Sequence, residues 1–132
     1  MFLKFNLPTF AWASVIFALC SMPGKSIPHI SWLELLSFDK LVHASIFFIM
    51  QVLLMRGFNL QDRYVALQNN YKIVSSLVCI TYGGLLEVMQ SYCFADRSGD
   101  LLDFLANSIG CILGLFVYKK IQTKFQFFKV DN

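Results

Sequence analysis

The sequence DLLDFLANSIGCILGLFVYKK at residues 100–120 indicates what class of protein this chain is. Between Leu101 and Tyr118 the residues are almost all apolar, and two lysines follow directly. A helix needs about 20 predominantly apolar residues to cross the hydrocarbon core of a bilayer. The stretch therefore predicts a transmembrane helix that begins in polar residues and ends in basic ones.

Three earlier stretches have the same character. They run from about Phe5 to Met22, from about Leu41 to Met55 and from about Ile73 to Met89. Each is slightly shorter than the ~20 apolar residues of a full span, and its flanking polar turns bring it to spanning length. The sequence thus predicts an all-α integral membrane bundle of four transmembrane helices, which fills residues 1–132 as a single domain.

The composition agrees with a membrane protein and argues against a soluble or nucleic-acid-binding domain. Of the 132 residues, 57% are hydrophobic and 14% are charged, whereas soluble domains carry about 25% charged residues. The net charge of +3 is no nucleic-acid signal, because the basic residues flank the apolar stretches and form no separate patch. The expected partner is the lipid bilayer, and no nucleic acid is expected.

The distribution of basic residues predicts the orientation of the bundle. Eight lysines and arginines lie in the N-terminal segment, the second loop and the C-terminal tail, and three lie in the first and third loops. Loops rich in lysine and arginine stay on the cytoplasmic side. We therefore expect both the N- and C-termini to be cytoplasmic, and the first and third loops to face outward.

Polar residues that could carry chemistry occur at one end of the apolar stretches, the end that this topology turns outward. Ionisable groups inside transmembrane helices are costly and usually mark a functional site. These residues come from three segments of the chain: Asp39, His43, Glu87, Gln90, Arg97, Asp100, Asp103 and Asn107.

Residue spacing places these groups on shared helix faces, because residues three and four apart are neighbours on a helix. The faces are Asp39 with His43, Gly83 with Glu87 and Gln90, and Asp103 with Asn107, Gly110 and Gly114. Small residues let helices approach closely in a membrane, so the glycines predict faces that pack inside the bundle. Asp103 and Asn107 are then expected to point inward as well.

Each residue has a structural explanation when it is taken alone. A GxxxG pattern is common in transmembrane helices. A lone His43 is more often a hydrogen-bonded core histidine than a ligand, and a surface ion pair between Arg97 and Asp100 would contribute little. The set as a whole favours function, because a purely structural bundle does not need several acids at one depth.

Three local features each allow two interpretations. The first stretch could be a signal peptide that starts at Lys4, but no small-x-small cleavage site follows cleanly, so an uncleaved helix is favoured. Residues 32–38 could form a short interfacial helix or a plain loop. Cys20 and Cys93 are expected near the same membrane face, where a disulfide is conceivable.

The order of the polar motifs carries a resemblance to a known family. The pattern is Asp39-Lys40-x-x-His43, Glu87-x-x-Gln90 and Arg97-x5-Asp103-x3-Asn107-x2-Gly110-x3-Gly114. Over residues 39–115 it resembles the VanZ-like family of small bacterial membrane proteins, except that the loop before Arg97 lacks the usual Pro-Gly. The resemblance adds Lys40 to the expected pocket. It implies a multi-pass protein of the bacterial inner (cytoplasmic) membrane that functions at the cell envelope, and its founding member is associated with teicoplanin resistance.

Three functions remain open. The favoured one is a binding protein that holds a cell-envelope or lipid-linked group, such as a lipid-linked cell-wall precursor or a lipoglycopeptide, with Arg97 clamping a phosphate or carboxylate. A second is an intramembrane enzyme acting on a lipid-linked substrate. In it, acid–base groups act directly or hold a hard divalent cation, the candidates being Asp39, His43, Glu87 and Asp103. A third is a structural polar network with its function in a partner protein. No recognised metal-ligand motif occurs, so no cofactor is expected.

Overall fold

The computed structural model describes residues 1–22, 32–94 and 99–129, and for residues 32–37 it describes the backbone only. Its elements, in chain order, are α1 (Phe2–Ser21), α2 (Trp32–Leu60), α3 (Val65–Asn69), α4 (Tyr71–Tyr92), α5 (Leu101–Lys124) and the 3-10 helix η2 (Gln126–Phe128). No β-strand occurs in the described ranges, and the predicted all-α class is confirmed.

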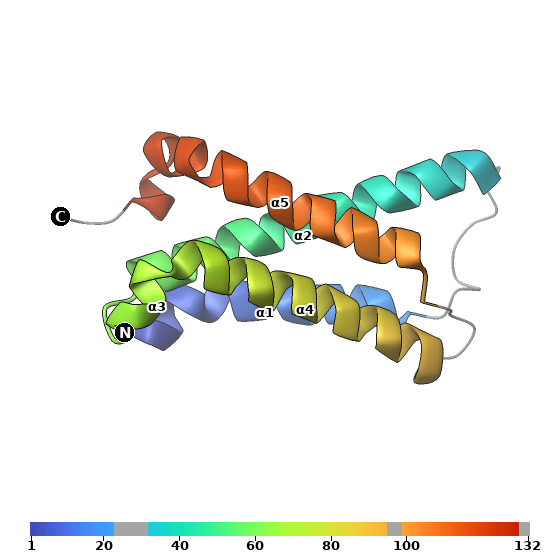
Figure 1. The fold of residues 1–132 in the computed structure, drawn as a ribbon, viewed down its shortest axis with the longest axis horizontal. Coiled ribbons are helices and arrows are strands. Elements are labelled where there is room, and N and C mark those ends of the chain that lie inside the picture. Colours follow the sequence, from blue (N-terminus) through green and yellow to red (C-terminus); the bar gives the residue numbers. More distant parts are fainter. Residues whose placement is uncertain (23–31, 95–98, 130–132) are drawn as a thin grey trace.

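Within the described residues, four helices are long and apolar enough to cross a membrane, as the sequence predicted. The candidate spans are Phe2–Ser21, Phe38–Leu60, Tyr71–Tyr92 and Leu101–Lys124, each 20 to 24 residues long. At about 1.5 Å per residue, such spans cover the ~30 Å hydrocarbon core. They exceed the apolar stretches because helical hydrogen bonding continues into the flanking polar turns. The start of α1 and the helix η2, which lie near the two termini in the sequence, are at the same end of the bundle (Figure 1).

The central helix of the bundle is α2. It contacts α1, α4 and α5, and its contact with α5 is the most extensive among the described elements. Of the residues in its most apolar window, 56% are buried inside the protein, compared with at most 33% in the other three spans. The remaining helices therefore surround α2 and leave apolar outer faces that suit a lipid environment.

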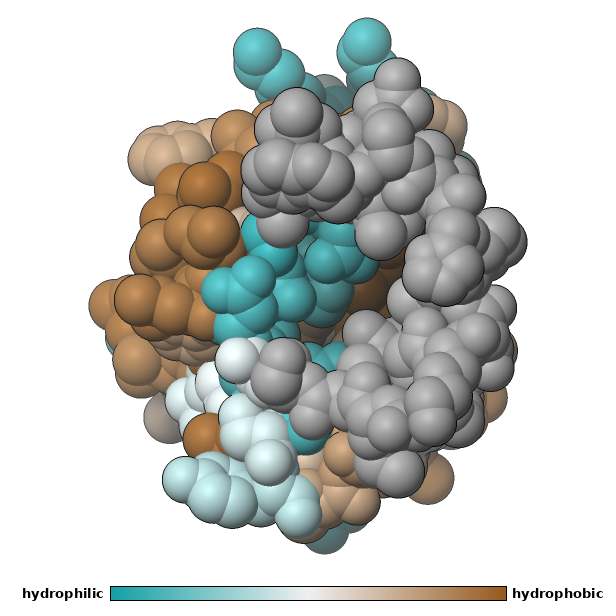
Figure 2. All heavy atoms as spheres, turned by 90° about the vertical axis from the view of Figure 1, so that its right-hand side faces the viewer, coloured by the Kyte–Doolittle hydropathy of each residue, from teal (hydrophilic) through white to brown (hydrophobic). Residues whose placement is uncertain are grey.

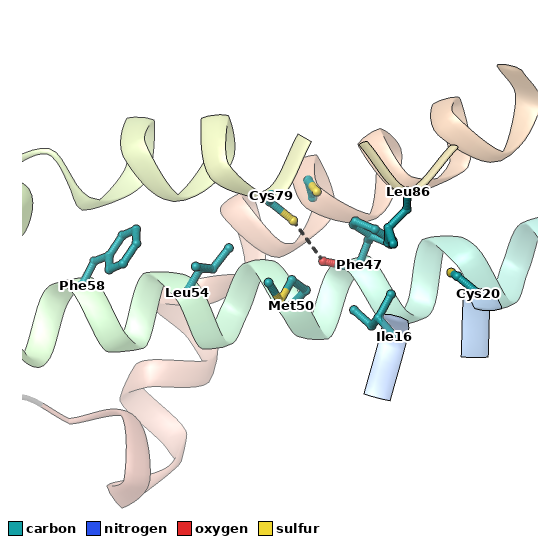
Figure 3. Close-up of a cluster of buried hydrophobic side chains, with 9 residues drawn as sticks. Ile16, Cys20, Phe47, Met50, Leu54, Phe58, Cys79 and Leu86 are labelled. Carbon is teal, nitrogen blue, oxygen red and sulfur yellow. Dashed lines mark hydrogen bonds between the residues drawn. The ribbon is translucent and has the colours of Figure 1, made fainter. Parts of the chain in front are cut away.

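The main hydrophobic core lies along α2 (Figure 3). Phe47, Met50, Leu54 and Phe58 of this helix belong to one buried cluster, whose other members are Ile16 and Cys20 of α1, Cys79 and Leu86 of α4, and Cys111 of α5. The Cys79 thiol donates a hydrogen bond to the Phe47 carbonyl oxygen, with 3.8 Å between the two atoms. This core fixes the middle of the three helices that supply the polar end.

Glycines on α5 allow it to lie directly against α2. A Cβ at Gly110 would overlap the carbonyl oxygen of Ala44, and a Cβ at Gly114 would lie 2.9 Å from the Cβ of Gln51. Gly83 of α4 is buried as well. Because the glycine half of the α5 face rests on α2, the polar half of the same face is directed toward α2 too.

The structure also decides two of the questions that the sequence left open. Residues from Trp32 onward are helical but belong to α2, so they form neither a plain loop nor a separate short helix. Cys20 is buried and Cys93 is exposed, and the structure contains no disulfide between them.

One buried cation lies at the end of the bundle that holds the termini. Arg56 is only 8% exposed, and it lies inside α2, which continues to Leu60, past the expected end of the apolar stretch. Its Nε donates a hydrogen bond of 2.8 Å to the carbonyl oxygen of Phe127. Its guanidinium carbon lies 3.6 Å from the centre of the Phe127 ring. Arg56 therefore attaches η2 to the bundle.

Candidate functional site

The polar groups predicted from the sequence gather at the end of the bundle opposite the termini. There the start of the α2 span, the end of α4 and the start of α5 come together (Figure 1). Figure 2 views this end, and hydrophilic side chains fill the middle of the face, beside the apolar side chains on its left. The residues that share contacts here are Asp39, Lys40, His43, Glu87, Asp100, Asp103 and Asn107.

Lys40 connects α2 to the start of α5 through ion pairs. Its Nζ lies 3.0 Å from Oδ2 of Asp100, forms a very close ion pair with Oδ1 of Asp103 and lies 3.9 Å from Oδ2 of Asp39. The Lys40 and Asp103 side chains are 22% and 13% exposed, so solvent screens their attraction only in part. The ammonium of Lys40 is therefore held by carboxylates of the protein itself.

A second set of contacts joins all three helices through Asn107. Its Oδ1 lies 2.9 Å from Nδ1 of His43 on α2, and its Nδ2 lies 3.5 Å from Oε1 of Glu87 on α4. Since the amide nitrogen faces the carboxylate, the amide oxygen faces the imidazole, and His43 Nδ1 must carry the hydrogen that it donates. His43, Glu87 and Asn107 are all buried.

Glu87 also positions the N-terminus of α5. Its Oε2 accepts a hydrogen bond of 3.0 Å from the backbone N–H of Asp100. Asp100 is the N-cap of α5, and its Oδ1 accepts a bond of 2.9 Å from the backbone N–H of Leu102. That bond, together with the ammonium of Lys40, lowers the pKa of Asp100 below its ordinary value of 3.8. Asp100 is therefore ionised at neutral pH and helps to fix the geometry of the site.

The other ring nitrogen of His43 faces two carboxylates. Its Nε2 lies 3.8 Å from Oδ1 of Asp39 and 3.8 Å from Oδ2 of Asp103, too far for a hydrogen bond. One ligand atom from each of these three residues lies within 4.8 Å of the others. Imidazole and carboxylate groups are suitable ligands for a divalent cation, so these three residues could hold one.

The described part of the site carries an excess of negative charge. It holds one ammonium, that of Lys40, and four carboxyl side chains, those of Asp39, Glu87, Asp100 and Asp103; Lys40 pairs with the three aspartates. Ionised carboxylates only accept hydrogen bonds. The arrangement therefore suits groups that donate hydrogen bonds or carry positive charge, such as amines, hydroxyls and cations.

One residue expected at the site is described by the structure but lies outside this network. Gln90 is buried, but its Nε2 donates a hydrogen bond of 3.2 Å to the carbonyl oxygen of Cys20, so it attaches α4 to α1. Arg97, the expected anion clamp, lies outside the described residues.

Ser91 takes part in the site although the sequence analysis did not single it out. Its Oγ accepts a hydrogen bond of 3.0 Å from the backbone N–H of Gly99. A Cβ at Gly99 would overlap the carbonyl oxygen of Glu87, so the chain passes directly over the end of α4. The position of Ser91, four residues after Glu87 on the same helix face, is the signal that could have identified it.

Comparison with known proteins gives one match. The family model described as VanZ/LLP1 matches residues 2–124, which include all four candidate spans and every described residue of the site. No curated protein and no solved structure matches the chain.

Proposed function

The chain belongs to the VanZ/LLP1 family, and from this premise we propose that it binds the polar head of a cell-envelope molecule in an outward-facing pocket. In this proposal the protein lies in the bacterial inner membrane with both termini in the cytoplasm. The basic residues at the terminal end support this orientation, because lysine and arginine are retained on the cytoplasmic side. The polar end then opens toward the cell wall.

One observation supports a binding site above all others. Side chains from α2, α4 and α5 form connected contacts at one end of the bundle, with His43, Asn107 and Glu87 linked in series. Ionisable groups within membrane-spanning helices usually mark a functional site, so the accumulation of several at one depth supports one. Groups that come from three packed helices are also held in fixed positions.

The excess of carboxylates favours a ligand that presents amines or hydroxyls beside an apolar anchor. Lipid-linked cell-wall precursors and lipoglycopeptides such as teicoplanin have this character. The carboxylates of Glu87 and Asp103 would accept hydrogen bonds from the head group, and Arg97 would contact its phosphate or carboxylate. A contribution to teicoplanin resistance would follow from binding of the antibiotic or of the precursor that it targets.

Binding to purified protein in lipid nanodiscs tests this function. Teicoplanin and a lipid-linked peptidoglycan precursor are titrated against the wild type, Glu87→Gln and Asp103→Asn. A lost hydrogen bond to a charged acceptor should weaken binding of at least one ligand roughly tenfold or more. The control is Asp62→Asn, which removes an exposed carboxylate that pairs with the N-terminal ammonium at the opposite end.

The results distinguish a role of these polar residues in ligand binding from a purely structural role. Equal affinity in all four proteins, measured per folded molecule, would contradict the proposal. If Glu87→Gln and Asp103→Asn lower only the amount of folded protein, the polar contacts serve to specify the helix arrangement, and function lies in a partner protein.

A second candidate function is an intramembrane enzyme, and one observation favours it. In the neutral tautomer whose Nδ1–H donates to Asn107, the free Nε2 of His43 faces the carboxylates of Asp39 and Asp103. This arrangement could act as a general base or bind a hard divalent cation. Metal analysis of the pure protein, with a search for altered lipid head groups in cells that overproduce it, tests this function. Protein without metal and cells without a new product would exclude it.

A further inference from the structure

At the end of the bundle that holds the termini, a groove runs between α4 and α5 on the outer surface. Its volume is about 540 Å³, and its lining is mainly apolar. The apolar lining residues are Ile73, Leu77, Ile80, Leu115 and Phe116. Ile73, Leu77 and Phe116 are more than 60% exposed, so the groove opens toward the surroundings and not into the bundle. Within a membrane, this surface meets the acyl chains of lipids.

Two lysines lie at the polar end of this groove. Lys72 stands in the first turn of α4, and Lys119 stands near the end of α5. Neither forms an ion pair with any carboxylate in the described part of the chain, and the Nζ of Lys72 lies 5.9 Å from the centre of the Tyr71 ring. The groove thus combines an apolar wall with two cations that have no anionic partner among the described residues.

The surroundings of the two lysines strengthen the need for an external anion. Among the described residues at this end, the one acidic side chain is Asp62, and it pairs with the N-terminal ammonium at 2.8 Å. Eight basic side chains occupy the same end: Lys4, Arg56, Arg63, Lys72, Lys119, Lys120, Lys124 and Lys129. Arg56 is buried against Phe127, whereas Lys72 and Lys119 are exposed.

We propose that this groove is a binding site for an anionic phospholipid, whose phosphate lies between Lys72 and Lys119 and whose acyl chain lies along the apolar wall. Basic pockets between transmembrane helices on the cytoplasmic side bind acidic lipid head groups. From Lys72 to Ile80 the wall extends about 12 Å along α4, which accommodates a substantial part of one acyl chain. A soluble anion would use the lysines but gain nothing from the apolar wall, so the groove selects a lipid.

The polar wall of the groove supports the same assignment. Ser76 lines it, but its hydroxyl donates to the carbonyl oxygen of Lys72 at 2.9 Å and accepts from Nε2 of Gln51 at 3.1 Å. The serine is therefore committed to the protein. Recognition of a bound lipid rests on the two lysines for charge and on the apolar side chains for the chain.

Native mass spectrometry of the detergent-solubilised protein tests the proposal, with phosphatidylglycerol and phosphatidylcholine as probes. The wild type should bind phosphatidylglycerol, which is anionic, more tightly than phosphatidylcholine. The double variant Lys72→Gln/Lys119→Gln should weaken that binding roughly tenfold, because each lysine near the surface contributes to the attraction of acidic lipids. The matched control Lys120→Gln/Lys124→Gln removes the same charge from the same end of α5, outside the groove lining, and should change binding less than about twofold.

The contribution of the apolar wall to lipid binding is tested with a variant that retains both lysines. Leu77→Trp places a larger side chain in the groove and should also weaken phosphatidylglycerol binding, while Lys72→Arg/Lys119→Arg should preserve it. Equal binding of the two lipids by the wild type would overturn the proposal. So would equal losses from the two lysine pairs, or phosphatidylglycerol binding that Leu77→Trp leaves unchanged.

Discussion

Asn107 of α5 holds the imidazole of His43 in a fixed orientation, with 2.9 Å between Oδ1 and Nδ1. The same amide turns its nitrogen toward Glu87 of α4, 3.5 Å away. One side chain thereby connects the three helices that form the polar end. Its contact with Nδ1 leaves the other imidazole nitrogen, Nε2, facing Asp39 and Asp103.

Replacement of Asn107 by leucine should destabilise the bundle by about 2 kcal/mol, because the buried donor of His43 and the buried carboxylate of Glu87 both lose a partner. Unfolding in detergent measures the change. Ser108→Ala is the matched control, since its hydroxyl bonds only to the carbonyl oxygen of Phe104 in its own helix. Equal stability of Asn107→Leu and the wild type would contradict the connecting role of the amide.

The N-cap of α5 predicts a specific pH dependence. The folded state lowers the pKa of Asp100 below 3.8, so its stabilisation is complete above that value and is lost as the pH falls through the folded-state pKa. Asp100→Ala should cost about 1 kcal/mol at neutral pH, whereas Asp100→Asn should cost less, because asparagine also caps helices. Thermal unfolding at neutral pH compares the two variants.

The same measurements between about pH 4 and pH 2 isolate the effect of the ionisable group. Over this range the melting temperature of the wild type should fall more than that of Asp100→Asn, because only the wild type has a carboxylate to protonate at this position. An identical pH profile for the wild type and Asp100→Asn would show that ionisation of Asp100 adds nothing to the cap.

Glycine positions on α4 and α5 differ in how much space they leave. Gly110→Ala should destabilise the protein by about 1–3 kcal/mol, because the new methyl group would overlap the Ala44 carbonyl and push α5 away from α2. Gly84→Ala should be nearly neutral, since its nearest neighbour would be a Phe104 ring carbon at 3.4 Å. Unfolding curves of the two variants provide the comparison, and a similar cost at both positions would argue against close contact at Gly110.

The proposed orientation can be checked on intact cells. Cys93 is the exposed cysteine of the chain and lies beside the polar end, whereas Cys20, Cys79 and Cys111 are buried. A membrane-impermeant maleimide should label Cys93 from outside. In the variant Cys93→Ser/Tyr64→Cys, the new thiol lies at the opposite end, where Tyr64 is 49% exposed, and should react only after permeabilisation. The reverse pattern would place the polar end in the cytoplasm and would exclude an envelope ligand.

Hydropathy and helical periodicity were sufficient to predict the all-α class and the four spanning helices. These features depend on local chemistry, because a bilayer accepts a chain only when each apolar segment satisfies its own backbone hydrogen bonds. The spacing of Asp103, Asn107, Gly110 and Gly114 similarly predicts one shared face on α5, since it follows from the helix repeat alone. Helix ends were less predictable, and α2 extends past Arg56 because polar residues can continue a helix.

The partner of each polar side chain depends on how the helices are rotated and packed, which no local pattern specifies. Gln90 lies three residues after Glu87, yet it bonds to α1 while Glu87 bonds to α5. Lys40 is surrounded by acids because α5 approaches α2 closely at Gly110, and Arg56 is buried because the tail folds back onto it. Only the packing of the helices brings these polar residues together in one acidic site, because each contact joins atoms from helices that are far apart in the chain.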